Sequence, residues 1–194
     1  MVICMRHEQT DWNAKDRGGE AEVLRGNVDI PLNAAGIADG HAKAEDICTK
    51  YPVVEVRCSP NFLRDKQTAQ IVADVCGVPL TMTDHLDPYD PGSLSGKSVE
   101  AIAVILDLLI NIPFLAAPGG GDTYADFINR VDAYFHSVYD PPPHGEGFGH
   151  DDSRALLLIY HGMEMRALPW IVERKPVQAY RHQSFKPGEF VVIH

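Results

Sequence analysis

The sequence is poor in cysteine, and its four cysteines fit no familiar pattern. Cys4, Cys48, Cys58 and Cys76 contain no C-x-x-C pair. Their spacing resembles neither a zinc site nor the disulfide framework of a small secreted domain. Cys4 and Cys58 lie in apolar, strand-like stretches, where buried free thiols are expected. Cysteine usage therefore predicts a reducing compartment.

Positive charge is also scarce. The chain has 17 Lys and Arg against 27 Asp and Glu, which gives a net charge of −10. Nucleic acid and an anionic membrane surface are therefore not expected as partners, because both require a basic face. A small anionic substrate remains compatible with this balance, since a few arginines in a cleft reverse the local field.

Long apolar runs are missing as well. The longest, residues 101–110, is interrupted by Asp107 and is too short to span a bilayer. No basic region followed by an apolar stretch marks a signal peptide at the N-terminus. We therefore expect a cytoplasmic protein. Its 194 residues suit one domain, 1–194, with a full-sized core.

Apolar runs that alternate with helix-like stretches define the fold class. Helix signals include Asn33 as an N-cap, Asp122 or Thr123 as a second cap, and Gly77 as a terminator. Strands alternating with helices predict an α/β protein with a mostly parallel sheet. The expected strands are 1–5, 53–58, 78–82, 155–160 and 190–193. Helices are expected at 34–50, 68–75, 97–112 and 124–139 and again after 162, with loops at 14–31, 84–96 and 140–153.

The expected helix 97–112 is unusually apolar. A buried helix is the simpler interpretation, and a homodimer interface is the alternative. His144 and His150 lie in the proline-rich loop 140–153 without an acidic or cysteine partner at ligand spacing, so we predict no metal site.

Reactive side chains follow three of the expected strands. Arg6-His7 follows the first strand, Ser59-Pro60 with Arg64 one turn later follows the second, and His161-Gly162 follows the fourth. Parallel strands present their carboxyl ends on one side of a sheet, where ligands bind. Arg6, His7, Arg64 and His161 can therefore converge. Two guanidinium groups and two imidazoles around one point suit a dianion such as a phosphoryl group.

These segments, in this order, resemble the histidine phosphatase superfamily, also called phosphoglycerate mutase-like. The matching stretches are 6–13, which begins with Arg6-His7, then 26–36, Ser59-Pro60 with 64–69, 118–120, and His161-Gly162 with 166–168. They cover nearly the whole chain. The resemblance implies a three-layer sandwich, with helices on both faces of a mostly parallel central sheet.

The resemblance also implies a reaction. His7 would attack phosphorus to form a phosphohistidine, which water hydrolyses. Arg6, Arg64 and His161 would bind the phosphoryl oxygens and stabilise the charge in transfer. The phosphate site would also include Asn13, Gly26 and Gly162. Nearby guanidinium groups favour the neutral His7 that attack requires. No metal or other cofactor is needed.

Two positions depart from the family pattern. Glu8 stands where the family most often has glycine, and its carboxylate would repel a phosphate unless the side chain points away. Pro88 stands where many members carry a glutamate that donates a proton to the leaving group. Asp90 is then the first candidate for that acid, Asp87 the second and Glu8 the third.

Taken together, the sequence predicts a phosphomonoesterase that acts on a small phosphorylated metabolite. A phosphoglycerate mutase is the enzyme alternative, ranked lower because the chain is short and the glutamate acid is missing. A phosphate-binding module that has lost catalysis is the alternative from a different class, with Glu8 and Pro88 as the cause of the loss.

Overall fold

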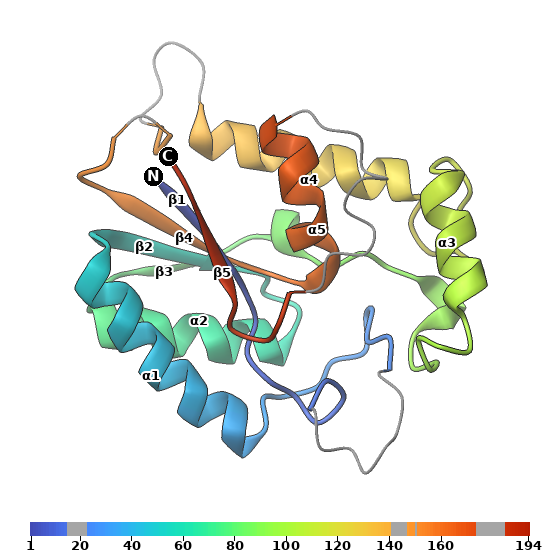
Figure 1. Ribbon diagram of the computed structural model, residues 1–194, viewed down its shortest axis with the longest axis horizontal. Helices are drawn as coiled ribbons and strands as arrows, with labels where there is room; N and C mark the ends of the chain where they lie inside the picture. The colour runs from blue at the N-terminus through green and yellow to red at the C-terminus, as the bar shows by residue number, and fades with distance from the viewer. Residues whose placement is uncertain (15–22, 141–146, 150, 174–184) are drawn as a thin grey trace.

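A computed structural model describes residues 1–14, 23–140, 147–149, 151–173 and 185–194. At its centre is a five-stranded sheet in the order β3-β2-β4-β1-β5 (Figure 1). The strands are β1 (Val2–Arg6), β2 (Val53–Cys58), β3 (Leu80–Met82), β4 (Ala155–Tyr160) and β5 (Phe190–Ile193). β1, β2, β3 and β4 run parallel, and β5 pairs antiparallel with β1. The predicted α/β class with a mostly parallel sheet is confirmed.

Side-chain alternation in the two central strands produces two cores, because successive residues of a strand point to opposite faces. Val2 and Cys4 of β1 join a core on one face, and Ile3 and Met5 join a core on the other. β4 alternates in the same way, and all six of its residues are buried. The predicted helix layers on both faces follow from this two-sided burial.

Helices α1 (Ala34–Lys50) and α2 (Leu63–Cys76) cover one face, and α4 (Tyr124–Tyr139) and α5 (Gly162–Glu173) cover the other (Figure 1). Asn33 caps α1 by accepting from the backbone N–H of Gly36 at 2.8 Å. Thr123, one of the two predicted caps, caps α4 through the backbone N–H of Asp126. Gly77 ends α2 in the left-handed conformation, as predicted.

The prediction of a buried helix at 97–112 is wrong. Helix α3 covers only Ala103–Asn111, and Leu109 is its one buried residue. Val104 on its outer side is 83% exposed, and Phe114 just beyond it is 82% exposed. The apolar composition of this helix predicts that it is buried on all sides. In the structure it lies to one side of the sheet, so only its inner side packs against other residues (Figure 1). The alternative, a homodimer interface, stays a prediction.

The remaining connections mostly follow the expected pattern. Two short 3-10 turns, Asp84–Leu86 and Gly92–Leu94, occupy the turn-rich stretch 84–96. β3 begins at Leu80, two residues later than predicted. Parts of the predicted loops 14–31 and 140–153, including His144 and His150, lie outside the described residues. Within the described residues, no helix has the length and apolar character needed to cross a membrane.

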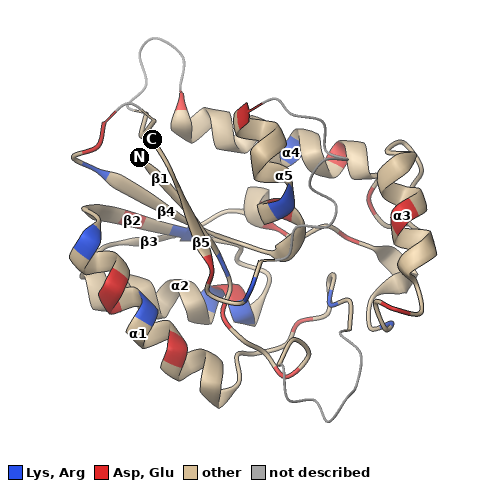
Figure 2. Cartoon of the chain, viewed as in Figure 1, with Lys and Arg blue, Asp and Glu red and all other residues tan. Residues whose placement is uncertain are grey.

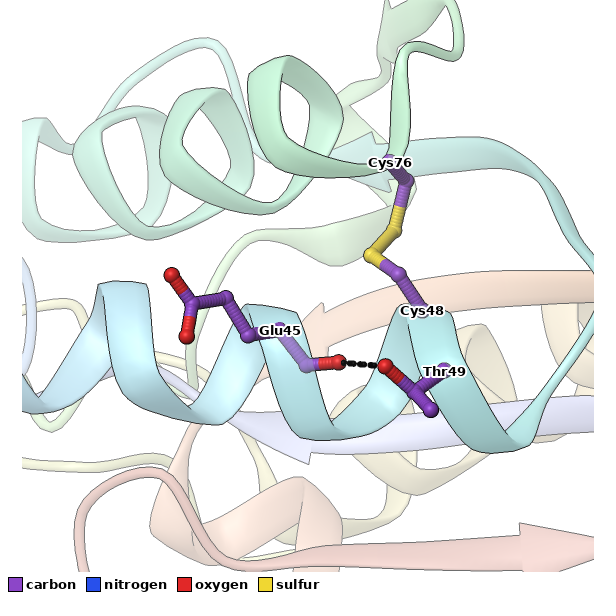
Figure 3. Close-up of a disulfide and its surroundings, with 4 residues drawn as sticks. All are labelled: Glu45, Cys48, Thr49 and Cys76. Carbon is purple, nitrogen blue, oxygen red and sulfur yellow. Dashed lines mark hydrogen bonds between the residues drawn. A yellow bond between two sulfur atoms is a disulfide. The ribbon is translucent and has the colours of Figure 1, made fainter.

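The cysteine prediction is correct for two residues and wrong for the other two. Cys4 and Cys58 are buried free thiols, as expected. Cys48 and Cys76, however, form a disulfide across a sequence separation of 28 (Figure 3). It joins the last turn of α1 to the end of α2. The inference of a reducing compartment from cysteine usage therefore loses its basis. Spacing alone could not reveal this pair, because the packing of α1 on α2 brings the two residues together.

Reduction of the Cys48–Cys76 disulfide is expected to lower the free energy of unfolding by about 3–4 kcal/mol, because it releases a loop of this length in the unfolded chain. Thermal unfolding with and without a thiol reductant measures the effect. A Cys48→Ser, Cys76→Ser double variant should unfold at the reduced protein's temperature and show no response to reductant. An unchanged melting temperature for the reduced wild type would contradict the prediction.

Candidate active site

A pocket of about 130 Å³ opens at the carboxyl ends of β1 and β4. Five of the predicted site residues line it: Arg6 at the end of β1, Gly26, Arg64 in the first turn of α2, His161 directly after β4, and Gly162 at the start of α5. The chain therefore brings cationic and imidazole groups together at the strand ends, where a parallel sheet places its ligands.

His7 lies just behind this pocket and is fully buried. Its ring centroid is 5.3 Å from that of His161. Its Nδ1 lies 2.8 Å from the carbonyl oxygen of Glu8. Because a carbonyl only accepts, Nδ1 carries the proton and Nε2 carries the free electron pair. Nε2 has no hydrogen-bond partner among the described residues.

The pKa of His7 is held well below its usual value. Burial is the main cause, and His161 and the guanidinium groups of Arg25, Arg64 and Arg6 add to it. The ring is therefore neutral at physiological pH, with its unprotonated Nε2 available for attack on phosphorus. The predicted effect of the arginines is present, but burial contributes more.

Arg64 joins the pocket to the segment around Gly26. Its Nη1 donates to the carbonyl oxygen of Val28 at 2.9 Å, and its Nη2 donates to that of Gly26 at 3.0 Å. The guanidinium also stacks on the ring of Phe62, 4.6 Å from its centroid. Gly26 has a φ of +49°, and a Cβ there would lie 2.4 Å from the ring of Pro91. Glycine at this position lets the backbone carbonyl reach Arg64.

His161 contacts an acidic residue, Asp65, that the sequence did not indicate as part of the site. Its Nε2 lies 2.9 Å from Oδ2 of Asp65, which is fully buried on α2. Burial lowers the pKa of His161 to about 3, although Glu164 opposes the shift. Burial likewise raises the pKa of Asp65 well above its usual range. Both shifts favour a pair without net charge.

Besides His7 and Glu8, three predicted residues do not line the pocket. Asn13 uses its Oδ1 to accept from the backbone N–H of Thr10 at 2.7 Å. Asp90 accepts from the backbone N–H of Gly92 at 2.8 Å. Asp87 accepts from the hydroxyl of Ser59 and the amide of Asn61. The side chain of Asp90 thus serves its own turn, and that of Asp87 joins the 84–94 segment to the segment after β2.

Glu8 points away from the phosphate site. Its backbone N–H donates to the hydroxyl of Thr68 at 3.0 Å, and its Cγ lies near Gly40 of α1. A Cβ built on Gly188 would lie 2.1 Å from Oε1 of Glu8. The departure from glycine at this position therefore places a carboxylate between α1 and the turn before β5. It leaves the pocket free of this negative charge.

Burial raises the pKa of Glu8 to about 7, while Lys43 opposes the shift and Asp39 adds to it. The folded state therefore holds a proton that the unfolded chain loses at lower pH. This residue's contribution to stability is full below the unfolded pKa, about 4.3, and declines as the pH rises through 7. Glu8→Gln is therefore expected to raise the free energy of unfolding at pH 8 by about 1–2 kcal/mol, discounted for partial solvation.

Denaturant unfolding of both proteins at pH 5 and pH 8 checks this prediction, since the gain at pH 5 should be about a third of the gain at pH 8. Glu45→Gln, on the exposed side of α1, serves as the control and should change stability at neither pH. An equal gain for Glu8→Gln at both pH values would show that Glu8 does not titrate in this range.

The sequence missed several residues of the pocket lining, among them Arg25, Arg166 and Glu164. Arg25 stands directly before the predicted Gly26, and Arg166 lies in a stretch noted only for its resemblance. Glu164 lies in the first turn of α5, where an acid is an ordinary helix-terminal residue and gives no signal of a site. Among the described residues, no group of three His, Cys, Asp or Glu side chains is placed to hold a metal ion.

The fold and the site match one family of proteins. The sequence profile of the histidine phosphatase superfamily (branch 1) matches residues 2–194. The chain belongs to that superfamily.

Similar proteins within this comparison carry more than one activity in their names. The chain is 26% identical to proteins from Salmonella choleraesuis and Proteus mirabilis that are named probable phosphoglycerate mutase GpmB. In each case the alignment covers 93% of this chain and 78% of the relative. A mycobacterial glucosyl-3-phosphoglycerate phosphatase shares the fold at a TM-score of 0.74 and 22% identity, over 97% of this chain and 87% of its own. A Thermus thermophilus protein matches at a TM-score of 0.65 and 20% identity, over 98% and 91%.

Proposed function

We propose that this protein is a phosphomonoesterase that hydrolyses a small phosphorylated metabolite through a phosphohistidine at His7. The supporting observation is the unprotonated Nε2 of His7, buried beside a pocket lined by Arg6, Arg25, Arg64 and His161. Histidine phosphatases and mutases share this first step. What separates them is whether water or a second alcohol receives the phosphoryl group.

In the proposed reaction, the phosphoryl group enters between the guanidinium groups and His161. Arg6 and His161 shift as it enters, because His7 lies behind the pocket lining. Nε2 of His7 attacks phosphorus in line with the leaving oxygen, and the P–O bond breaks as the P–N bond forms. The guanidinium groups stabilise the charge on the equatorial oxygens. Water then cleaves the P–N bond and releases phosphate.

The far wall of the pocket favours hydrolysis of an ester with an apolar or amphipathic leaving group. Leu106, Leu109 and Ile110 of α3 line this wall, together with Val99 and Phe185. Residues 98–117 contain no Lys, Arg or His, and in Figure 2 no part of the α3 ribbon has the blue of Lys and Arg. A mutase must hold an acidic product in place while its phosphoryl group returns, and α3 offers no cation for that purpose.

The test compares an aromatic phosphomonoester, 2-naphthyl phosphate, with 3-phosphoglycerate. We expect phosphate release with a kcat/KM about tenfold or more higher for the aromatic ester, because its ring becomes buried against α3. Conversion of 3-phosphoglycerate to its 2-isomer faster than phosphate release would establish the mutase. Phosphate binding without turnover of either ester would establish the binding module.

Two leucines on opposite sides of α3 provide matched variants. Leu106→Arg places a cation in the pocket and is expected to reduce kcat/KM for naphthyl phosphate while sparing 3-phosphoglycerate. Leu108 is 46% exposed on the outer side of the same helix, and Leu108→Arg should leave both values unchanged. Equal losses for both esters in the Leu106 variant would count against an apolar leaving-group site.

A further inference from the structure

Glu164 is a buried carboxyl group that the reaction described so far leaves without a role. It is the third residue of α5, lies three positions after His161, and has no exposed surface. Neither of its carboxyl oxygens has a hydrogen-bond partner among the described residues. A buried polar group without a partner costs about 1–3 kcal/mol, so one that is retained calls for an explanation.

Glu164 is also part of the pocket lining, alongside Arg6, Arg64 and His161. Pro88, which stands where many family members carry an acid, lines the same pocket from another segment of the chain. Arg130 on α4 fixes this segment by donating to the carbonyl oxygens of His85 and Asp87 at 3.1 and 2.7 Å. A carboxyl group therefore reaches the pocket from α5, although the 84–94 segment supplies none.

The three acids considered from the sequence are engaged elsewhere. Asp90 accepts a hydrogen bond within its own turn, Asp87 accepts from Ser59 and Asn61 in the segment after β2, and Glu8 lies against Gly40 and Gly188. None of the three lines the pocket in the part of the chain that the structure describes. Glu164 is the one carboxyl-bearing side chain of the described lining.

We propose that Glu164 is the proton donor to the leaving oxygen, and the proton acceptor for the attacking water in the second step. The assignment rests on the proposed phosphatase reaction and names its missing acid.

The proton transfers balance over one turnover. In the first step, the P–O bond to the leaving group breaks, the P–N bond to His7 forms, and the leaving oxygen takes the proton of the Glu164 carboxyl. In the second step, a water oxygen attacks phosphorus and the P–N bond breaks, while the Glu164 carboxylate takes the proton that the water loses. Phosphate leaves, and both His7 and Glu164 return to their starting states.

The surroundings of the Glu164 carboxyl favour its protonated form. Burial raises its pKa above the ordinary value; His161, the backbone N–H of Glu164 itself and Arg130 lower it, and Asp65 raises it. The other charged or titratable groups that interact with it are Arg64 on α2, Tyr124 on α4 and Tyr160 on β4. An acid with a raised pKa is the kind that donates a proton near neutral pH.

The test is Glu164→Gln, which keeps the shape of the side chain and removes the acid. For a phosphomonoester of an alkyl alcohol, kcat/KM should fall by about 10²–10³. The leaving group of 4-nitrophenyl phosphate needs no proton, so the initial burst of nitrophenolate should keep its wild-type rate. The steady-state rate that follows should fall, because the second step has lost its base. Labelled phosphohistidine should then accumulate. The alkaline limb of kcat/KM in the wild type should be missing from the variant.

Glu189→Gln, near β5 and outside the pocket lining, is the matched control and should behave like the wild type. Equal losses for both esters, or a burst slowed as much as the alkyl reaction, would overturn the acid role and indicate a structural one. Failure of the proposed function itself looks different, since the wild type would then form no phosphohistidine and release no phosphate from either ester. Melting temperatures of the wild type and Glu164→Gln show whether the variant folds.

Discussion

His7→Ala is expected to abolish the phosphoenzyme and to lower kcat by on the order of 10⁴-fold or more. The neutral ring is oriented by the carbonyl oxygen of Glu8 at 2.8 Å, so that Nε2 holds the free electron pair. His161, 5.3 Å away, has its Nε2 beside Asp65.

The measurement is a rapid quench under neutral or alkaline conditions after mixing with a ³²P-labelled ester, because phosphohistidine is labile in acid. Label should appear on the wild type and be missing from His7→Ala. His41→Ala serves as the control, since His41 is exposed on α1 and its loss should change neither labelling nor kcat. Label retained on His7→Ala would move the nucleophile to another residue.

Much of the fold was predictable because its signals are local. β1 and β4 are short apolar runs that end in charged or polar side chains, and Asn33, Thr123 and Gly77 mark helix ends by their own chemistry. A buried parallel strand needs little more than its own sequence to be recognised. The convergence of Arg6, Arg64 and His161 then follows from the rule that parallel strands share one carboxyl end.

The predictions that failed share a different cause. Each concerns a residue or helix whose environment is set by another element that packs against it. Cys48 and Cys76 pair because α1 packs on α2. The apolar helix α3 is partly exposed because only its inner side meets the pocket. Glu8 avoids the phosphate because space between α1 and Gly188 receives its side chain. Spacing along the chain contains none of this information.

The choice of proton donor shows the same limit. Sequence order drew attention to Asp90 and Asp87, because they lie near the position where the family carries its acid. In the folded chain the Asp90 carboxylate accepts within its own turn and the Asp87 carboxylate accepts from Ser59 and Asn61. Glu164 lines the pocket from a helix about 75 residues later in the sequence. A residue that is missing from a motif can be replaced by one from a distant part of the sequence that reaches the same pocket. Position in the pocket is therefore the better guide to the proton donor.

Arg64→Lys is expected to lower kcat/KM by about 10²–10³, although the substitution conserves charge. Arg64 does two things at once. Its two terminal nitrogens donate to the carbonyl oxygens of Val28 and Gly26, and its buried Nε has no partner in the described part of the chain. A lysine ammonium is a point charge on a flexible stem, so it cannot span both carbonyls and also present a planar donor to a phosphoryl oxygen.

Steady-state kinetics with a single ester and equilibrium binding of inorganic phosphate together test this expectation. Both kcat/KM and phosphate affinity should fall, and the free energy of unfolding should drop by about 1–2 kcal/mol as the Gly26 and Val28 carbonyls lose their donors. Arg57→Lys is the matched control, because Arg57 on β2 pairs with Glu55 instead. Unchanged kinetics in Arg64→Lys would show that Arg64 holds the 26–28 segment without taking part in phosphoryl binding. Positive charge at the pocket would then rest on Arg6, Arg25 and Arg166.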